Sequence, residues 1–399
     1  MPEIYLDNAA TTPVDPDVQE AMMPWMTEKF GNPGSLYSIG REARDAVEKA
    51  RSQVAALINA RPDQIIFTSG GCEANTLAIM GSIDERRRRN RPVCVTTPVE
   101  HESIQRCLAK AYPLEVVKYC RINVAHKDEP FCNENFFQLP RLQSKDPVSL
   151  VSLMLENNEV PIAYDKTLQY YLSKCKEKEA LVHGDAVQAL GSQKIDVRGE
   201  QIWYDMISMS SHKIHGPKGA GALYVKHPNM LSPVIFGGGG QEFGLRGGTE
   251  NAAAIVGFGK ACELLKENRE AFFKRQIICA TAFDAAFRQK CADLGIHGRI
   301  RRNGTQLSKV LSYTIDGIDA ETLILVLDNA GVYISAGSAC SSHEKVPSQV
   351  LKSLGLTDQQ ARSTIRVSFS RMSTKMECAA GGYIMADCVK KLLGGVENG

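Results

Sequence analysis

Lys213 lies in the stretch SMSSHKIHGPK, residues 208–218, which follows a short apolar run ending at Met209. A lysine directly after a strand, surrounded by hydroxyl and histidine side chains and followed by Gly-Pro, is typical of a lysine that forms a Schiff base with pyridoxal 5'-phosphate (PLP). An exposed basic loop would have a similar composition. A second residue is needed to decide between the two interpretations.

Asp185 supplies that second residue, in the stretch HGDAVQ, residues 183–188. PLP is a better electron sink when a carboxylate keeps its pyridine nitrogen protonated, and Asp185 closes a predicted strand ahead of Lys213. Gln188 follows closely enough to reach the ring 3-oxygen. An aspartate at a strand end is otherwise most often a helix cap, so the pairing with Lys213 carries the prediction of a PLP site.

Helix and strand signals alternate around these residues, which favours an α/β fold with a mostly parallel sheet. We expect a large PLP-binding domain over residues 14–255, and a smaller α+β domain from residues 1–13 and 256–399. Short apolar runs predict strands at residues 65–68, 93–97, 148–155, 180–182, 206–209 and 221–225, and apolar periodicity predicts helices at 41–60, 73–80 and 253–274. Ser69-Gly70-Gly71, between a strand and a helix, is a candidate phosphate cradle or a plain tight turn.

Composition excludes several classes of protein. The chain has 399 residues with 47 Lys and Arg against 45 Asp and Glu, so we expect no nucleic-acid binding driven by bulk charge. The run RRRRNR at 86–91 is interpreted as a solvated helix end. No apolar run reaches the length of a membrane span and the N-terminus does not resemble a signal peptide, so we expect a cytoplasmic protein. The twelve cysteines include no CxxC pair, and we expect no metal site and no disulfide framework.

Ten stretches, those of Asp185 and Lys213 among them, occur in an order that resembles the cysteine desulfurases of the class V aminotransferase fold. They cover nearly the whole chain: YLDNAATTP (5–13), FGNP (30–33), FTSG (67–70), EH (100–101), NNE (157–159), Asp185 with Gln188, SSHKIHGPK (210–218), residues 237–249, SAGSACSS (335–342) and IRVS (365–368). The resemblance implies a PLP-dependent transferase fold of type I, a homodimer, and conversion of L-cysteine to L-alanine.

The same resemblance assigns roles to individual residues. Lys213 corresponds to the Schiff-base lysine, Asp185 and Gln188 to the ring partners, and His101 to a histidine that stacks on the ring and shuttles protons. It implies phosphate contacts from the first turn after the cradle, from the Lys213 stretch and from the other subunit; these residues are Gly71, Cys72, Ser210, His212 and Thr249. Asn158 is expected to contact both cofactor and substrate, and Arg366 to hold the substrate carboxylate.

Cys340 is the cysteine that the resemblance singles out. It lies among small residues in SAGSACSS, where a mobile loop would expose its thiol, whereas most of the other cysteines are expected to be buried. In the family this thiolate takes the sulfur as a persulfide and delivers it to an acceptor protein for iron–sulfur cluster assembly or for tRNA or cofactor thiolation. Selenocysteine lyase, another PLP lyase of the same fold, and a non-catalytic sulfur-transfer subunit remain open alternatives at this point.

The chain departs from the family pattern at several positions. Cys72 stands where the family usually has threonine, Tyr37 and Phe243 replace a histidine and an arginine, and Glu156 precedes the NNE stretch. Residues 120–146 match little of the family. No departure removes a catalytic group.

Overall fold

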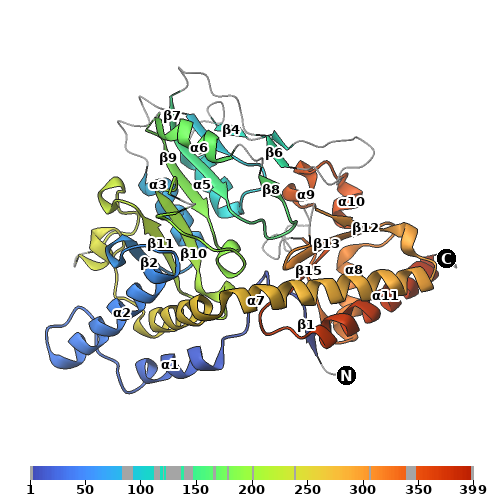
Figure 1. The fold of residues 1–399 in the computed structure, drawn as a ribbon, viewed down its shortest axis with the longest axis horizontal. Coiled ribbons are helices and arrows are strands. Elements are labelled where there is room, and N and C mark those ends of the chain that lie inside the picture. Colours follow the sequence, from blue (N-terminus) through green and yellow to red (C-terminus); the bar gives the residue numbers. More distant parts are fainter. Residues whose placement is uncertain are drawn as a thin grey trace.

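The computed structural model describes residues 3–82, 93–111, 117–119, 121–122, 136–138, 147–164, 168–177, 179–199, 202–237, 240–304, 307–337 and 347–396. Figure 1 shows a large α/β domain and a smaller domain, with one long helix, α7 (Ala252–Asp293), running along both. Both ends of the chain lie on the side of the smaller domain.

A seven-stranded sheet forms the centre of the large domain. Its strands, in spatial order, are β2 (Ile65–Thr68), β11 (Gly221–Val225), β10 (Met206–Ser210), β9 (Leu181–Asp185), β7 (Val148–Met154), β3 (Val93–Thr96) and β4 (Val117–Tyr119). All neighbours are parallel except β11, which is antiparallel to β2 and β10. The predicted α/β fold with a mostly parallel sheet is therefore confirmed, and each of the six predicted strands is present with ends that differ by a few residues.

Both faces of this sheet are covered, which explains why its strands are short continuous apolar runs. In β2, Ile65 and Phe67 point into one hydrophobic core while Ile66 points into another on the opposite face. The helices of the large domain are α1 (Pro16–Met26), α2 (Ser38–Leu57), α3 (Gly71–Gly81), α5 (Glu102–Ala111) and α6 (Leu168–Glu177). The predicted apolar face of α2 is buried, from Ala43 to Leu57.

The smaller domain encloses its own core around a three-stranded antiparallel sheet, β12 (Ile300–Asn303), β13 (Val310–Ile315) and β15 (Thr364–Ser368). Strand β1 (Ile4–Tyr5) pairs with β14 (Val332–Tyr333), so the N-terminal segment packs beside residues of the smaller domain. The remaining α-helices are α8 (Ala320–Asn329), α9 (Gln349–Ser353), α10 (Asp358–Arg362) and α11 (Lys375–Val396). A fourth sheet contains β5 (Arg121–Ile122), β6 (Phe136–Gln138) and β8 (Ala163–Tyr164).

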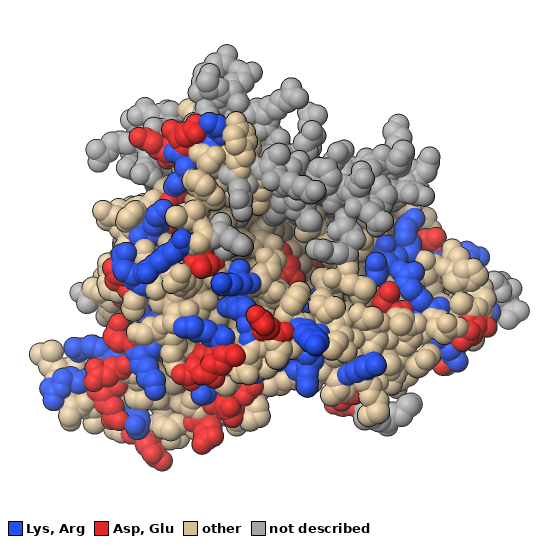
Figure 2. Space-filling model, viewed as in Figure 1, with Lys and Arg blue, Asp and Glu red and all other residues tan. Residues whose placement is uncertain are grey.

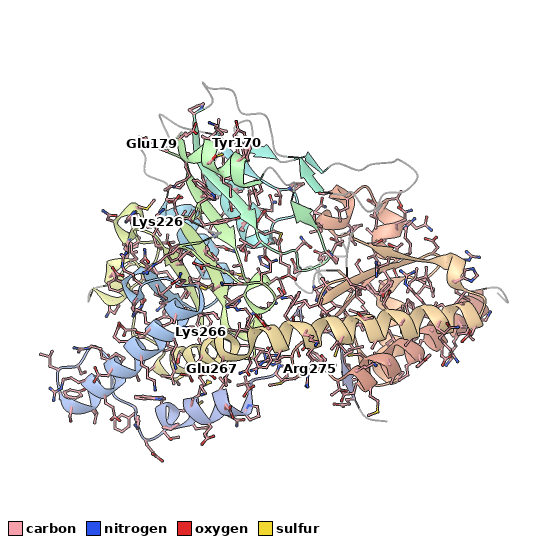
Figure 3. All side chains as sticks on the ribbon, viewed as in Figure 1. Tyr170, Glu179, Lys226, Lys266, Glu267 and Arg275 are labelled. Carbon is pink, nitrogen blue, oxygen red and sulfur yellow. The ribbon has the colours of Figure 1, made fainter. Side chains whose placement is uncertain are left out.

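The two cores divide helix α7 at a different place from the predicted domain change near residue 255. Residues Ala254–Leu265 pack into a core of the large domain, and Cys279–Cys291 pack into that of the smaller domain. Asn268 lies between them with non-helical φ and ψ, and Figure 3 shows Lys266 and Glu267 before Arg275 along this helix. The helical periodicity of the sequence continues from the part of α7 that packs in the large domain to the part that packs in the smaller one. The sequence therefore shows no break at the point where the helix passes from one core to the other.

The charged side chains are mixed in sign over the face shown in Figure 2, in agreement with a formal net charge of +2. No helix among the described residues is long and apolar enough to cross a membrane.

Candidate active site

Lys213 ends the short turn Ser211–Lys213 that follows strand β10. Its Nζ donates hydrogen bonds to the backbone oxygens of Ala9, at 2.5 Å, and Ala10, at 2.8 Å. The N-terminal segment therefore passes directly over the lysine. The sequence predicted the importance of both segments but not this contact.

The N-terminal segment is held in place by the same turn. The amide and hydroxyl of Thr12 both donate to the backbone oxygen of His212 at 3.0 Å. The Nδ1 atom of His212 lies 3.1 Å from the Thr11 hydroxyl. Burial, followed by the charge of Lys213, lowers the pKa of His212 to about 4, so this imidazole is neutral near pH 7.

Asp185 closes strand β9 with both carboxylate oxygens occupied by donors. Asn75 Nδ2 donates to Oδ2 at 2.9 Å, and the amide of Val187 donates to Oδ1 at 2.9 Å. Gln188 donates from Nε2 to the backbone oxygen of Ala9 at 3.0 Å, the oxygen that also accepts from Lys213. The structure thus brings the predicted lysine, aspartate and glutamine together at the carboxyl ends of adjacent strands.

The start of helix α3 has the properties of a phosphate cradle. Gly70 has a φ of 156° and provides no side-chain cap, so the amides of the first turn are left for another acceptor. A Cβ at Gly71 would lie 2.6 Å from a methyl group of Val187, so only glycine fits there. The nearby Ser210 hydroxyl is buried without a hydrogen-bond partner among the described residues. An unpaired buried hydroxyl beside an uncapped helix N-terminus fits the phosphate of PLP.

Cys72 and Thr249 are both exposed to solvent. Cys72 is exposed in the first turn of α3. Thr249 is exposed on the segment before α7, and that segment is tied to the same turn because Arg246 Nε lies 2.9 Å from Glu73 Oε1.

Arg366 extends from strand β15 of the smaller domain and is 2% exposed. Its Nη2 lies 2.7 Å from Asp7 Oδ1, and its Nη1 donates to the backbone oxygen of Asn158 at 3.1 Å. Its Nε is buried without a partner among the described residues, which leaves a charged donor for a ligand carboxylate. Burial raises the pKa of Asp7 and outweighs the opposing effect of Arg366.

Glu159 lies at both described ends of the segment that contains Cys340. Ser348 donates to Glu159 Oε2 at 2.5 Å, and a Cβ at Gly337 would lie 3.2 Å from the same oxygen. Just before Gly337, Ser335 pairs with Arg366 through two backbone hydrogen bonds. Cys340 itself lies outside the described residues.

His101 precedes helix α5 and is partly buried. Its charge acts on Glu159, whose pKa is raised by burial and lowered in part by Ser348, Arg366 and His101. The histidine is therefore close enough to Glu159, which lies beside the ends of the Cys340 segment, to act on the charge of this carboxyl group.

Two further titratable groups are fully buried in the large domain close to these residues. His183 lies between the hydroxyls of Ser152 and Ser208, each at 2.9 Å, and burial lowers its pKa to about 4. Glu100, next to His101, accepts from Thr97 and from the amide of Met154, and burial raises its pKa to about 8.

The sequence predictions missed Asp7, Asn75 and Glu159 as members of the site. Asp7 and Glu159 belong to stretches that carried the family resemblance, and Asn75 follows the cradle by one helical turn. For Asp7 and Glu159, the signal that could have identified them was a carboxylate within a matched stretch; for Asn75 it was a polar side chain one turn after the cradle. Within the described ranges, no group of three or more His, Cys, Asp and Glu side chains could hold a metal ion.

Comparison with known proteins agrees with this geometry. The family model described as aminotransferase class-V matches residues 4–380. The chain is 37% identical to a cysteine desulfurase IscS of Clostridium botulinum over 375 residues, covering 94% of this chain and 91% of that protein. It is 39% identical to a mitosomal cysteine desulfurase of Trachipleistophora hominis over 398 residues, covering 98% and 87%. Among solved structures, a NifS-like protein superposes with a TM-score of 0.80 at 29% identity, covering 98% of this chain and 99% of the other.

Proposed function

The chain belongs to the class V aminotransferase family and, within it, to the PLP-dependent cysteine desulfurases, and from that premise we propose how its own residues serve the reaction. The enzyme converts L-cysteine to L-alanine and transfers the sulfur to an enzyme thiol. When bound, PLP supplies the electron sink for the bond changes at the substrate carbon atoms. Lys213, Asp185 and Gln188 would hold its reactive carbon, its ring nitrogen and its 3-oxygen, and the α3 cradle with Ser210 would hold its phosphate.

Cys340 is the proposed sulfur acceptor. Its thiolate attacks the substrate sulfur, an S–S bond forms, and the substrate C–S bond breaks with its electron pair passing to the substrate carbon. A proton then completes alanine, and Cys340 is left as a persulfide. The observation that carries this role is that the two described ends of its segment lie beside Glu159 and Arg366.

Arg366 is the proposed contact for the substrate carboxylate, together with Asn158. Nη1 and Nη2 each use one hydrogen, on the Asn158 backbone and on Asp7, so Nε is the one nitrogen of this guanidinium without a partner among the described residues, and the second hydrogen of each terminal nitrogen also remains for the ligand. Because Arg366 is almost completely buried, water competes little for these donors. His101 is the proposed proton carrier beside the substrate.

We further propose that the enzyme is a homodimer in which Thr249 contacts the phosphate held by the other subunit. Large apolar side chains are exposed on the α1–α2 connection and on the segment before Thr249; they are Phe30, Leu36, Tyr37, Phe236 and Phe243. Apolar exposure of this extent is typical of a covered interface. The test mixes a Lys213→Ala protein with a Thr249→Ala protein. Subunit exchange creates one site with both residues, so activity and tight PLP binding should return; no recovery after verified exchange contradicts the shared site.

The persulfide on Cys340 requires a sulfur-acceptor protein, which we propose serves iron–sulfur cluster assembly or a thiolation pathway. We also propose a reducing compartment such as the cytoplasm, because all nine described cysteines are free thiols. Transfer of labelled sulfur to a panel of acceptors would identify the partner.

The experiment that tests the function is purification followed by an absorbance spectrum with and without L-cysteine, with alanine and sulfide both quantified. We expect a visible cofactor band that changes on addition of L-cysteine, and equal amounts of alanine and mobilised sulfur. Lys213→Ala should lose the wild-type visible band while remaining folded. Alanine formation with L-selenocysteine but not with L-cysteine would refute the proposed substrate.

A further inference from the structure

A chain of hydrogen bonds joins His101 to Asp185. His101 Nδ1 lies 2.8 Å from Ser103 Oγ, Asn75 Nδ2 donates to Ser103 Oγ at 3.0 Å, and the same nitrogen donates to Asp185 Oδ2 at 2.9 Å. Ser103 comes from helix α5, Asn75 from α3 and Asp185 from β9. Three elements that are separate in the sequence therefore connect two residues to which the reaction assigns different tasks.

The direction of each hydrogen bond follows from the groups involved. A carboxylate accepts hydrogen bonds, so the Asn75 amide nitrogen must face Asp185, and its second hydrogen points to Ser103. The Ser103 oxygen then accepts from Asn75, and its own hydrogen is left for His101 Nδ1. The backbone amide of Ser103 also donates to Nδ1, at 3.1 Å. A nitrogen that accepts from two donors carries a lone pair, so the neutral ring of His101 has its proton on Nε2.

We propose that Ser103 and Asn75 are positioning residues, which hold His101 as the Nε2–H tautomer and couple its orientation to that of Asp185. The inference rests on the proposed function for the role of His101, but the tautomer can be measured independently of activity. In the reaction, the fixed tautomer would place the only ring proton of neutral His101 on Nε2, the nitrogen that is not used by Ser103.

Asn75 itself argues against a purely structural role. It is 1% exposed, and its Oδ1 is buried without a partner among the described residues. An unsatisfied buried acceptor is unfavourable for folding, and the neighbouring Ala74 and Ala78 show that this face of α3 is otherwise apolar. An apolar side chain would fill the position at lower cost. The amide is therefore better explained by its two acceptors, Ser103 and Asp185.

The test determines the tautomer of His101 by ¹⁵N NMR of histidine-labelled protein, in both the apoenzyme and the holoenzyme. The chain contains eight histidines, and His101→Gln assigns the signal. We expect wild-type protein to show the Nε2–H form alone, Ser103→Ala to show a mixture of both neutral forms, and Ser103→Thr to restore the wild-type signal. Thr76→Ala is the matched control, because this hydroxyl is next to Asn75 but donates to Cys72 within its own helix. It should leave the tautomer unchanged.

Kinetics of the holoenzyme provide the second measurement. Ser103→Ala should lower kcat about tenfold, because only part of the rate contribution of a positioned acid–base group is lost when its tautomer is no longer fixed. KM should change less than about twofold. Asn75→Leu removes the orphaned acceptor together with the donor to Asp185; it should shift the visible cofactor band and loosen the tautomer.

Three results separate the possibilities. An unchanged tautomer in Ser103→Ala overturns the proposal, even if the variant is less stable. An unchanged tautomer and cofactor band in Asn75→Leu shows that Asn75 is only structural and also overturns it. A tautomer that shifts as expected, in a protein that releases no alanine from L-cysteine, supports the positioning role while refuting the proposed function.

Discussion

Glu242→Gln should destabilise the protein strongly, because Glu242 is the buried partner of Arg51. Arg51 Nη1 lies 2.7 Å from Glu242 Oε2, and Nη2 donates to Oε1 at 2.8 Å. The two side chains are only 4% and 2% exposed. Glu242 Oε2 also accepts from the amide of Phe67 at 2.6 Å. Both carboxylate oxygens thus accept from buried donors, Oε2 from two and Oε1 from one.

The magnitude follows from this geometry. Glutamine keeps the shape but has one oxygen, so its NH₂ group must face a donor of Arg51 or the Phe67 amide. Arg51 then keeps a buried charge with Glu48 as its remaining acidic partner. Breaking a buried pair from one side costs about 3–5 kcal/mol. Glu48→Gln is the matched control: Glu48 lies 3.0 Å from Nε of the same arginine but is 52% exposed, so we expect about 0–1 kcal/mol.

Urea unfolding at pH 7 measures the free energy of unfolding of both variants. The protein concentration is kept the same, because association contributes to the apparent stability of an oligomer. The loss of stability in Glu242→Gln should also weaken cofactor binding. Glu242 and Phe243 have positive φ values of 44° and 57°, and this backbone leads to Thr249 and forms part of the proposed subunit interface. Glu242→Gln should therefore retain PLP less tightly than Glu48→Gln. A difference between the two variants below about 1 kcal/mol would refute the buried-pair reasoning.

Three other outcomes are expected. Cys340→Ser should still change the visible cofactor band on adding L-cysteine, yet form no protein persulfide; undiminished sulfur release would exclude its role as acceptor. His183 has a pKa lowered from 6.5 to about 4, so the unfolded chain gains a proton that the folded protein refuses, and stability should fall by about 1.4 kcal/mol per unit as the pH drops through that window. In His183→Asn, the free energy of unfolding measured with urea should depend less steeply on pH over the same range. Lys309→Met should raise KM more than it weakens PLP binding, because Lys309 donates to the backbone of Gln188 across the domains and lies 3.7 Å from Glu156.

The sequence predicted the features that depend on local pattern. Strands buried on both faces have continuous apolar runs, so the runs ending near Asp185 and Lys213 could be recognised without knowing their neighbours. Parallel strands also place their carboxyl ends at one edge of the sheet, and this explains why two residues at strand ends could be assigned to one site before the sheet was known. Tertiary contacts have no such local signal. The salt bridge between Asp7 and Arg366 joins residues that are 359 positions apart, and nothing near either one predicts the other.

The two domains contribute different residues to the site, and the long-range contacts show which residues come from each domain. Lys213, Asp185 and His101 are all positioned by elements of the large domain, whereas Arg366 comes from a strand of the smaller one. The N-terminal segment connects them, since Asp7 binds Arg366 while Ala9, two residues later, accepts from Lys213. The large domain therefore holds the groups that we assign to the cofactor, and docking of the smaller domain adds Arg366 to Asn158 as the contacts that we assign to the substrate carboxylate. Substitutions at the domain contact should then act on KM while leaving PLP bound, and substitutions in the sheet should act on both.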